Sequence, residues 1–411
     1  MVGRRIYRLA LAALSIVVAA SLIAGARATH VAAGGDAVGT YSSAIVYAGQ
    51  VHDFYVDSTT DTLQHAWFSN GWHSETLDGA GAVGGNGRTS DEVGQYNSAV
   101  VYNGQLHDFY LDSTANVLRH AVWTGNRWFF EALDGSGVSG GNGRTSDSVG
   151  YNNAAVIYNG QVQDFYTDST TNVLRHAAYA GGWFFEALDG PGVGGGNGRT
   201  SDFVGSYNSA VVYNGQLQDF YYDSTSDRLR HAAYAGGWFF EALDGSGVSG
   251  GNGRTPDGVG SYNAAIIYNS QVHDFYFDFA ANTLRDAVWS GGGWFFEVLD
   301  GAGGSNGQTT DNVGDYNSAV IYNGQLQIFS YDFSVGNLRH SWYSNVWRAE
   351  ALDGTGVCAG NGCFSSDSVG NYNSAIIYNG LPQDFYYDGT NPQLRHAVWN
   401  GSAWFSESPV G

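Results

Sequence analysis

The chain has 411 residues, including 12 Trp, 27 Tyr, 22 Phe and 60 Gly, but only 5 Pro and 2 Cys. A chain so rich in aromatic residues and so poor in Pro is neither collagen-like nor disordered, so we expect it to fold around a large core. All 17 basic residues are Arg, and 38 acidic residues give a formal net charge of −21. We therefore do not expect the protein to bind nucleic acids, because neutralising phosphates requires a basic surface.

The first 28 residues resemble a secretory signal peptide. Arg4, Arg5 and Arg8 precede an apolar run at residues 9–24, and small residues at Ala26 and Ala28 suit a cleavage site. An uncleaved membrane anchor is the alternative, although the run is short for a bilayer span of about 20 residues. We therefore expect a secreted chain of residues 29–411 that does not contact the membrane after cleavage.

Seven copies of one unit follow, and we place them at residues 39–93, 94–149, 150–204, 205–259, 260–313, 314–369 and 370–411. Each copy has a Tyr that ends an apolar tetrad, namely Tyr47, Tyr102, Tyr158, Tyr213, Tyr268, Tyr322 and Tyr378. Each also has a Trp followed three residues later by a Glu, the first pair being Trp72 and Glu75. We therefore expect a single domain after the first 28 residues.

The second unit shows the expected strands most clearly, at residues 98–102, 106–111, 118–123 and 128–133. Asn103-Gly104 favours a two-residue hairpin between the first two strands. The Gly-rich segment 134–150 is too long for a hairpin and is expected to connect one unit to the next. A four-stranded antiparallel meander repeated seven times predicts an all-β fold, a seven-bladed β-propeller. We expect the ring to close by face packing between the first and last blades, without a swapped strand.

The two Cys lie in one of these long segments. Cys358 and Cys363 are separated by four residues and are predicted to form a disulfide in an oxidising compartment. A metal pair is the alternative, but neither a Cys-x-x-Cys motif nor a nearby His supports it.

The sequence predicts no catalytic residue, metal or cofactor. A reaction centre needs a singular arrangement of acid, base and nucleophile, whereas Glu131 and its counterparts recur in every unit and are interpreted as structural. The singular residues Asp286, Ile328 and Ser330 form no triad and are interpreted as drift. The segment 140–147 is not a phosphate-binding loop, because that motif requires Lys.

Arg residues recur at two positions. The long segments carry Arg88, Arg144, Arg199 and Arg254, which are expected either to belong to plain crossing loops or to help form pockets between blades. The third strand carries a second set, Arg119, Arg175, Arg230, Arg285, Arg339 and Arg395, followed by His in most units. Buried Arg and His need partners, so ion pairs with the second-strand Asp, such as Asp53, are the structural alternative to ligand binding.

Aromatic residues give the clearest indication of function. The third strand ends in Phe68, Trp123, Tyr179, Tyr234, Trp289, Tyr343 or Trp399, close to the fourth-strand Trp. A sugar offers a C–H face that stacks on such a ring and hydroxyls that need polar partners. Core packing between blades is the alternative for the same rings.

Three segments of the second unit, residues 99–110, 118–120 and 128–135, resemble the repeat of bacterial seven-bladed β-propeller lectins and, more loosely, of fungal fucose-specific lectins. The resemblance covers all seven units and implies several pockets between adjacent blades for fucose or related, sometimes methylated, sugars. Two differences stand out. The fungal pocket uses an Arg on strand two and a Glu on strand three, where this chain has His107 or Asp108 and His120, and the bacterial repeat has Trp in place of Arg119. The identity of the sugar therefore does not transfer.

The expected function is non-catalytic binding of glycans or glycoconjugates by a secreted lectin. A protein-interaction or envelope-structural propeller is the alternative, and a polysaccharide hydrolase or lyase is less favoured. The expected sugar-binding residues are Arg119, Trp123, Arg144, Arg175, Tyr179, Arg199, Arg230, Tyr234, Arg254, Arg285, Trp289, Arg339, Tyr343, Arg395 and Trp399.

Overall fold

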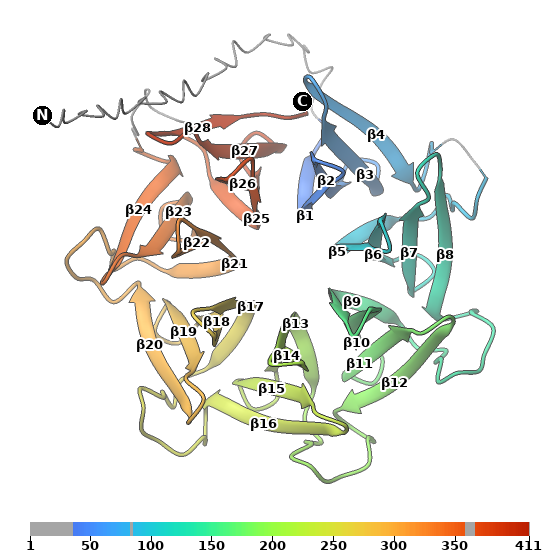
Figure 1. Ribbon diagram of the computed structural model, residues 1–411, viewed down its shortest axis with the longest axis horizontal. Helices are drawn as coiled ribbons and strands as arrows, with labels where there is room; N and C mark the ends of the chain where they lie inside the picture. The colour runs from blue at the N-terminus through green and yellow to red at the C-terminus, as the bar shows by residue number, and fades with distance from the viewer. Residues whose placement is uncertain (1–35, 83–84, 358–365, 411) are drawn as a thin grey trace, which may run out of the picture. The chain divides into compact units, whose positions relative to one another are not determined.

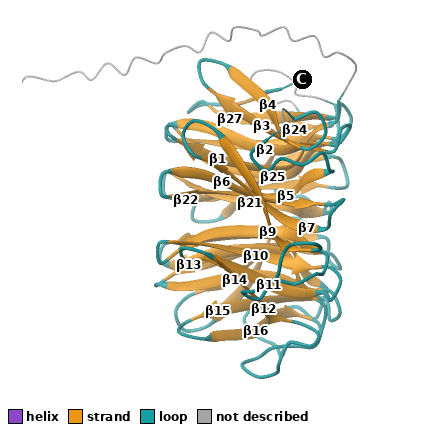
Figure 2. Cartoon of the chain, turned by 90° about the vertical axis from the view of Figure 1, so that its right-hand side faces the viewer, coloured by secondary structure: helices purple, strands orange, loops and turns teal. Residues whose placement is uncertain are grey.

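The computed structural model describes residues 36–82, 85–357 and 366–410, which form 28 strands and no helix. The strands make seven four-stranded antiparallel sheets, each built from consecutive strands and arranged around a central axis (Figure 1). A view from the side shows only strands and their connecting loops (Figure 2). This confirms the predicted seven-bladed β-propeller.

Every blade places its first two strands nearest the axis. The first strands are β1 (Val38–Tyr47), β5 (Val93–Tyr102), β9 (Val149–Tyr158), β13 (Val204–Tyr213), β17 (Val259–Tyr268), β21 (Val313–Tyr322) and β25 (Val369–Tyr378). The second strands are β2 (Gln50–Asp57), β6 (Gln105–Asp112), β10 (Gln161–Asp168), β14 (Gln216–Asp223), β18 (Gln271–Asp278), β22 (Gln325–Asp332) and β26 (Leu381–Asp388).

The outer half of each blade contains the other two strands. The third strands are β3 (Thr62–Phe68), β7 (Val117–Trp123), β11 (Val173–Tyr179), β15 (Arg228–Tyr234), β19 (Thr283–Trp289), β23 (Asn337–Tyr343) and β27 (Gln393–Trp399). The fourth strands, at the rim, are β4 (Trp72–Asp78), β8 (Trp128–Gly135), β12 (Trp183–Asp189), β16 (Trp238–Gly245), β20 (Trp294–Asp300), β24 (Trp347–Gly354) and β28 (Trp404–Glu407).

The first hairpin forms where the sequence predicts it. Tyr102 pairs with Gln105, and the two residues between them, Asn103 and Gly104, both have positive φ, at 49° and 71°. The first strand, however, is longer than expected: β5 begins at Val93 and not at residue 98. A register shift between Gln95 and Ser98, with Tyr96 at φ 57°, interrupts the pairing. Such a bulge hides the early part of the strand from a search for alternating residues.

The hydrophobic core lies between blades. One cluster joins Phe109 and Leu118 of blade 2 to Tyr166 and Phe185 of blade 3, and all four side chains are fully or almost fully buried. Burial of a side chain of this size contributes about 1.5–3 kcal/mol. Each blade is therefore stabilised mainly by its two neighbours, and we call the packed contact between two successive blades a joint.

The joint between blades 7 and 1 closes the ring (Figure 1). The amide of Ala44 in β1 donates to Oγ of Ser374 in β25 at 2.7 Å, and Nε1 of Trp72 donates to Glu407 at 2.9 Å. Since the sheets of blades 1 and 7 contain only their own strands, closure without a swapped strand is confirmed.

The Gly-rich segments cross from one blade to the next. In the segment between blades 2 and 3, the amide of Phe185 donates to the carbonyl oxygen of Asn142 at 2.8 Å. A Cβ on Gly143, which has a φ of +85°, would collide with the carbonyl oxygen of Phe185. Gly is needed at this position because the loop lies directly against the outer strand of the next blade.

Among the described residues, no helix is long and apolar enough to cross a membrane. The expected signal peptide at residues 1–28 and the expected Cys358–Cys363 disulfide lie outside the described residues. Both therefore stay predictions.

Candidate functional site

The third-strand Arg residues hold successive blades together. Nε of Arg175 in β11 lies 3.2 Å from Oδ2 of Asp134, which belongs to β8 of the preceding blade, and both residues are buried. NH2 of Arg175 donates to the carbonyl oxygen of Gly143 in the crossing loop at 2.7 Å. An equivalent ion pair is made by Arg119, Arg230, Arg285, Arg339 and Arg395. A guanidinium committed to a buried carboxylate argues against the expected sugar-binding role of these six Arg.

The structural alternative, in which these Arg pair with the second-strand Asp at the position of Asp53, is wrong. Three of the Arg do lie 3.7–3.9 Å from the Asp that ends the second strand, namely Asp112, Asp278 and Asp388. Asp164 in β10 is fully buried, and neither of its carboxylate oxygens has a hydrogen-bond partner among the described residues. Burial raises the pKa of the Asp164 carboxyl well above its ordinary value. The pKa is raised in the same way for Asp108, Asp219, Asp274 and Asp384. Asp53 accepts a hydrogen bond from Oγ of Ser42 at 2.8 Å, and burial raises its pKa to about 8.

The joint between blades 7 and 1 is different. Gln64 pairs with Tyr55 across β2 and β3 in the register in which Arg119 pairs with Tyr110 in blade 2. The Asp of the ion pair is replaced as well. Val410 occupies the repeat position of Asp134 and packs against the apolar cluster of this joint. Replacing both members together avoids an unpaired buried charge.

The loop Arg residues attach the crossing loops to the blades. Nε of Arg144 donates to the carbonyl oxygen of Leu133 at 2.6 Å, and its guanidinium lies 4.7 Å from the centroid of the Phe185 ring. The same two kinds of contact are made by Arg88, Arg199 and Arg254. Gln308 preserves the hydrogen bond in the next segment, to Leu299 at 2.7 Å. These four half-buried Arg are therefore loop anchors that also border the outer part of the joints in which they lie.

The aromatic residues that end the third strands lie at the hairpin end of the joints. We define a groove as the part of a joint at the hairpin end of the blades, where Trp123 and Trp128 lie. The rings of these two residues are 5.5 Å apart at 51° to each other. Each of the other rim rings packs on its fourth-strand Trp at a similar distance, namely Phe68, Tyr179, Tyr234, Trp289, Tyr343 and Trp399. The rings are half-buried, so part of each faces solvent.

A Glu from the preceding blade forms the opposite wall of each groove. Oε1 of Glu131 accepts a hydrogen bond from Nε1 of Trp183 in the next blade at 3.3 Å and lies 3.0 Å from Nδ1 of His120. Partial burial opposes ionisation of Glu131, but the hydrogen bond and charge of His120, together with Trp183 and Arg144, lower its pKa. The Glu131 carboxylate is therefore ionised at neutral pH, and the pKa is lowered in the same way for Glu75, Glu186, Glu241 and Glu407.

The third-strand His connects each Glu to the blade interior. Nε2 of His120 lies 2.8 Å from Nδ1 of His107, and burial lowers the pKa of His107 to about 3. His120 therefore contacts Glu131 through one ring nitrogen and His107 through the other. In blade 5 the position of His120 is taken by Asp286, which lies 2.8 Å from Nδ1 of His273. This network supports the structural interpretation of the third-strand His.

A cavity of about 210 Å³ lies in the groove between blades 6 and 7. Blade 6 contributes residues of β21 to β24, and blade 7 contributes residues of β26 to β28 (Figure 1). The lining consists of Tyr322, Gln325, Gln327, His340, Trp342, Glu350, Pro382, Trp399 and Trp404. Among the expected sugar-binding residues, Trp399 is the one that lines this cavity.

Sequence reasoning missed several of these lining residues, above all Glu350 and Trp342. The Glu was interpreted as structural because it recurs in all units, although its side chain is 44% exposed. Trp342 replaces the Val or Ala found at this position in five of the other units, such as Val122. Aligning the seven units at this position would have revealed the substitution.

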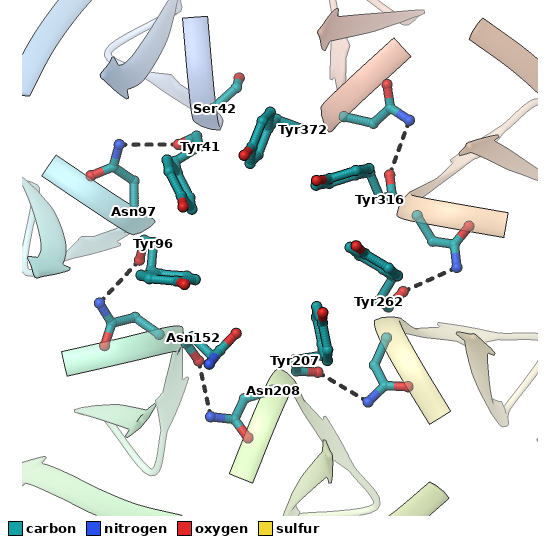
Figure 3. A pocket seen from close by; sticks show the side chains of 14 residues that line it. Tyr41, Ser42, Tyr96, Asn97, Asn152, Tyr207, Asn208, Tyr262, Tyr316 and Tyr372 are labelled. Carbon is teal, nitrogen blue, oxygen red and sulfur yellow. Dashed lines mark hydrogen bonds between the residues drawn. The ribbon is translucent and has the colours of Figure 1, made fainter. Parts of the chain in front are cut away.

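A second cavity, of about 190 Å³, lies on the central axis. Figure 3 shows six Tyr side chains projecting from the first strands into it, with Asn152 at the seventh position. Hydrogen bonds next to the Tyr rings link adjacent blades (Figure 3). For example, Nδ2 of Asn97 donates to the carbonyl oxygen of Tyr41 at 3.0 Å. Burial is the main cause of the raised pKa of Tyr41 and Tyr96, so the phenols are neutral. The lining of this cavity contains no residue that is charged at neutral pH.

No protein-family model and no curated protein matches the chain. Among solved structures, the fucose-specific lectin from Aleuria aurantia is similar, with 15% identity over 76% of this chain and 95% of that chain and a TM-score of 0.44. The β-propeller domain of the Trilobed protease from Pyrococcus furiosus has 6% identity over 91% and 97% of the two chains and a TM-score of 0.46. A Trypanosoma rangeli sialidase mutant has 11% identity over 90% of this chain and 54% of that chain, with a TM-score of 0.42.

Proposed function

We propose that this protein is a secreted, multivalent carbohydrate-binding protein whose sites are the grooves between blades and that it does not cleave its ligand. The observation that supports this most strongly is the repeated pairing of a carboxylate and an indole N–H beneath a half-exposed aromatic ring, as with Glu131, Trp183 and Tyr179. An ionised carboxylate makes strong hydrogen bonds to hydroxyl groups, and an aromatic ring accommodates the C–H face of a sugar.

Binding without cleavage fits the number of carboxylates in a groove. A glycosidase uses two carboxyl groups roughly 5–9.5 Å apart around one bond. The described lining of the cavity between blades 6 and 7 contains a single acid, Glu350. Release of reducing ends from a polysaccharide by the purified protein would overturn this part of the proposal.

The repetition supports multivalent binding. Single shallow grooves bind weakly, but several on one rigid ring increase the effective affinity for a surface that displays many copies of a glycan. A glycan array probed with residues 29–411 tests the proposal directly. We expect binding that free sugar competes away, and no binding to any glycan would overturn the proposed function.

A protein-interaction role is the second candidate, and exposed Phe residues at the rim favour it. Phe184, Phe239 and Phe295 lie in fourth strands, and each is about half exposed, at 49–50%. Partners captured from culture supernatant separate the two functions. Elution by free sugar supports the lectin, whereas partners that stay bound in excess sugar but are lost on changing these Phe to Ser support a protein interface.

A further inference from the structure

The groove between blades 6 and 7 differs from the other six in its hydrogen bonds. In those six, Nε1 of the fourth-strand Trp donates to the Glu of the preceding blade, at 2.9–3.3 Å. Nε1 of Trp404 makes no such bond with Glu350 or with any other described residue, although both side chains line the same cavity. A donor and an acceptor that satisfy each other elsewhere therefore both remain available to a ligand here.

The same groove has an additional aromatic wall. Trp342 in β23 lies with its ring 5.1 Å from the His340 ring and 14° from parallel to it. Trp399 of blade 7 lines the cavity from the other side. Blade 1 alone among the other described third strands has a Trp at the position of Trp342, namely Trp67, but the groove beside it retains the bond between Trp128 and Glu75. Only the groove between blades 6 and 7, among those described, combines the extra indole with an unpaired donor.

The chemistry of the cavity limits the charge of its ligand. Glu350 supplies a carboxylate, Gln325 and Gln327 supply amides, and no Arg is among the residues that line it. An anionic sugar would place its carboxylate beside Glu350 with no Arg or Lys to pair with, while His340, the one basic residue of the lining, already contacts Glu350 and Gln327. This arrangement costs free energy in a partly desolvated site. Neutral sugars, with hydroxyls that donate to Glu350 and accept from Trp404, avoid this cost.

We propose that the seven grooves are unequal and that the one between blades 6 and 7 is the principal site, which binds a neutral sugar ring between Trp342 and Trp399. This inference rests on the proposed function and deepens it. Glu350 and Nε1 of Trp404 bind hydroxyls of the sugar, while the six other grooves must first break a Trp–Glu hydrogen bond and therefore bind more weakly.

Matched substitutions in two grooves test the proposal. Trp342→Val introduces the residue that blades 2, 5 and 7 have at this position, and Trp67→Val makes the same change where the Trp–Glu bond is closed. Glu350→Gln and Glu75→Gln form a second pair at half-exposed positions, 44% and 42% exposed, which the fold tolerates more easily. Titration calorimetry uses L-fucose, D-galactose, D-mannose and D-glucose, with D-glucuronate as the anionic counterpart of D-glucose.

We expect one tight site per chain for at least one neutral sugar, weakened at least tenfold by Trp342→Val and by Glu350→Gln and less than twofold by Trp67→Val and Glu75→Gln. Glucuronate should bind more weakly than glucose, and Glu350→Gln should reduce that difference. Seven equal sites, equal effects in the two grooves, or preference for glucuronate would overturn this inference and leave the proposed function standing. No binding of any of these sugars or of any glycan on the array would overturn both.

Discussion

The joint between blades 2 and 3 and the joint between blades 7 and 1 use the same strands but different chemistry. In the first, Arg175 and Asp134 form a buried ion pair. In the second, Gln64 and Val410 occupy the equivalent positions, and apolar packing takes over. The comparison shows that the Arg and the Asp of a buried ion pair depend on each other across two adjacent blades. Both residues are present in one joint, and both are replaced in the other.

The largest effect we expect is that of pH on stability, because buried second-strand Asp lie in both joints, Asp164 in the first and Asp53 in the second. Their pKa is raised in the folded state, so they hold protons that the unfolded chain has released at neutral pH. Their contribution to the free energy of unfolding is fully present below about pH 4, the pKa of Asp in the unfolded chain, and it is lost as the pH rises through the pKa of the folded state. Between pH 7 and 9, each protonated Asp should lower the free energy of unfolding by about 1.4 kcal/mol per pH unit.

Urea unfolding at pH 7, 8 and 9 measures this slope. Asp164→Asn should reduce this slope, and Asp53→Asn should reduce it mainly below about pH 8, where Asp53 still holds its proton. Stability that is constant or increases over this range in the parent protein would contradict the protonated state of these groups.

The second largest effect comes from breaking one ion pair. Asp134→Ala leaves Arg175 buried without its carboxylate and should lower the free energy of unfolding by about 3–5 kcal/mol. The double variant Asp134→Val with Arg175→Gln copies the closing joint and should lose much less. If the double variant is as unstable as the single one, the comparison between the joints fails.

The reverse change at the closing joint should have a somewhat smaller effect. Gln64→Arg places a guanidinium against Val410 and should cost roughly 3 kcal/mol, because the carboxylate that the preceding blade supplies in the other joints is replaced by an apolar side chain. Adding Val410→Asp should recover most of this loss. Thermal denaturation of the single and double variants is the measurement, and a Gln64→Arg variant as stable as the parent would show that the joint accommodates an unpaired charge.

The smallest effect concerns a feature that both joints share. The amide of Ala155 donates to Oγ of Ser98 at 2.8 Å, and the amide of Ala44 donates to Oγ of Ser374 at 2.7 Å. Ser98→Ala and Ser374→Ala should each cost about 1 kcal/mol, the contribution of one hydrogen bond. Chemical denaturation should give equal losses, and unequal losses would mean that the two joints also differ near the axis.

The fold was predictable from the sequence because each blade is local: the Tyr102 to Gln105 hairpin and the four-strand order follow from residues close together in the chain. The partner of Arg175 was not predictable in the same way, since Asp134 belongs to another unit and 41 residues separate them. The rim rings were placed correctly beside the fourth-strand Trp, yet the inequality of the grooves depends on whether Trp404 and Glu350 meet, a matter of packing between blades.

Each of the six joints with an ion pair also has a direction, since the acid is on one blade and the Arg is on the next. Two chains that meet through the faces bearing Val410 and Gln64 gain no ion pair, so end-to-end association through these faces has no electrostatic support. A circularly permuted chain opened between blades 2 and 3 would instead expose Asp134 on one terminal blade and Arg175 on the other. The complementary ends of such a chain would pair with those of its neighbours, so it should form fibres more readily than a chain opened at the joint between blades 7 and 1.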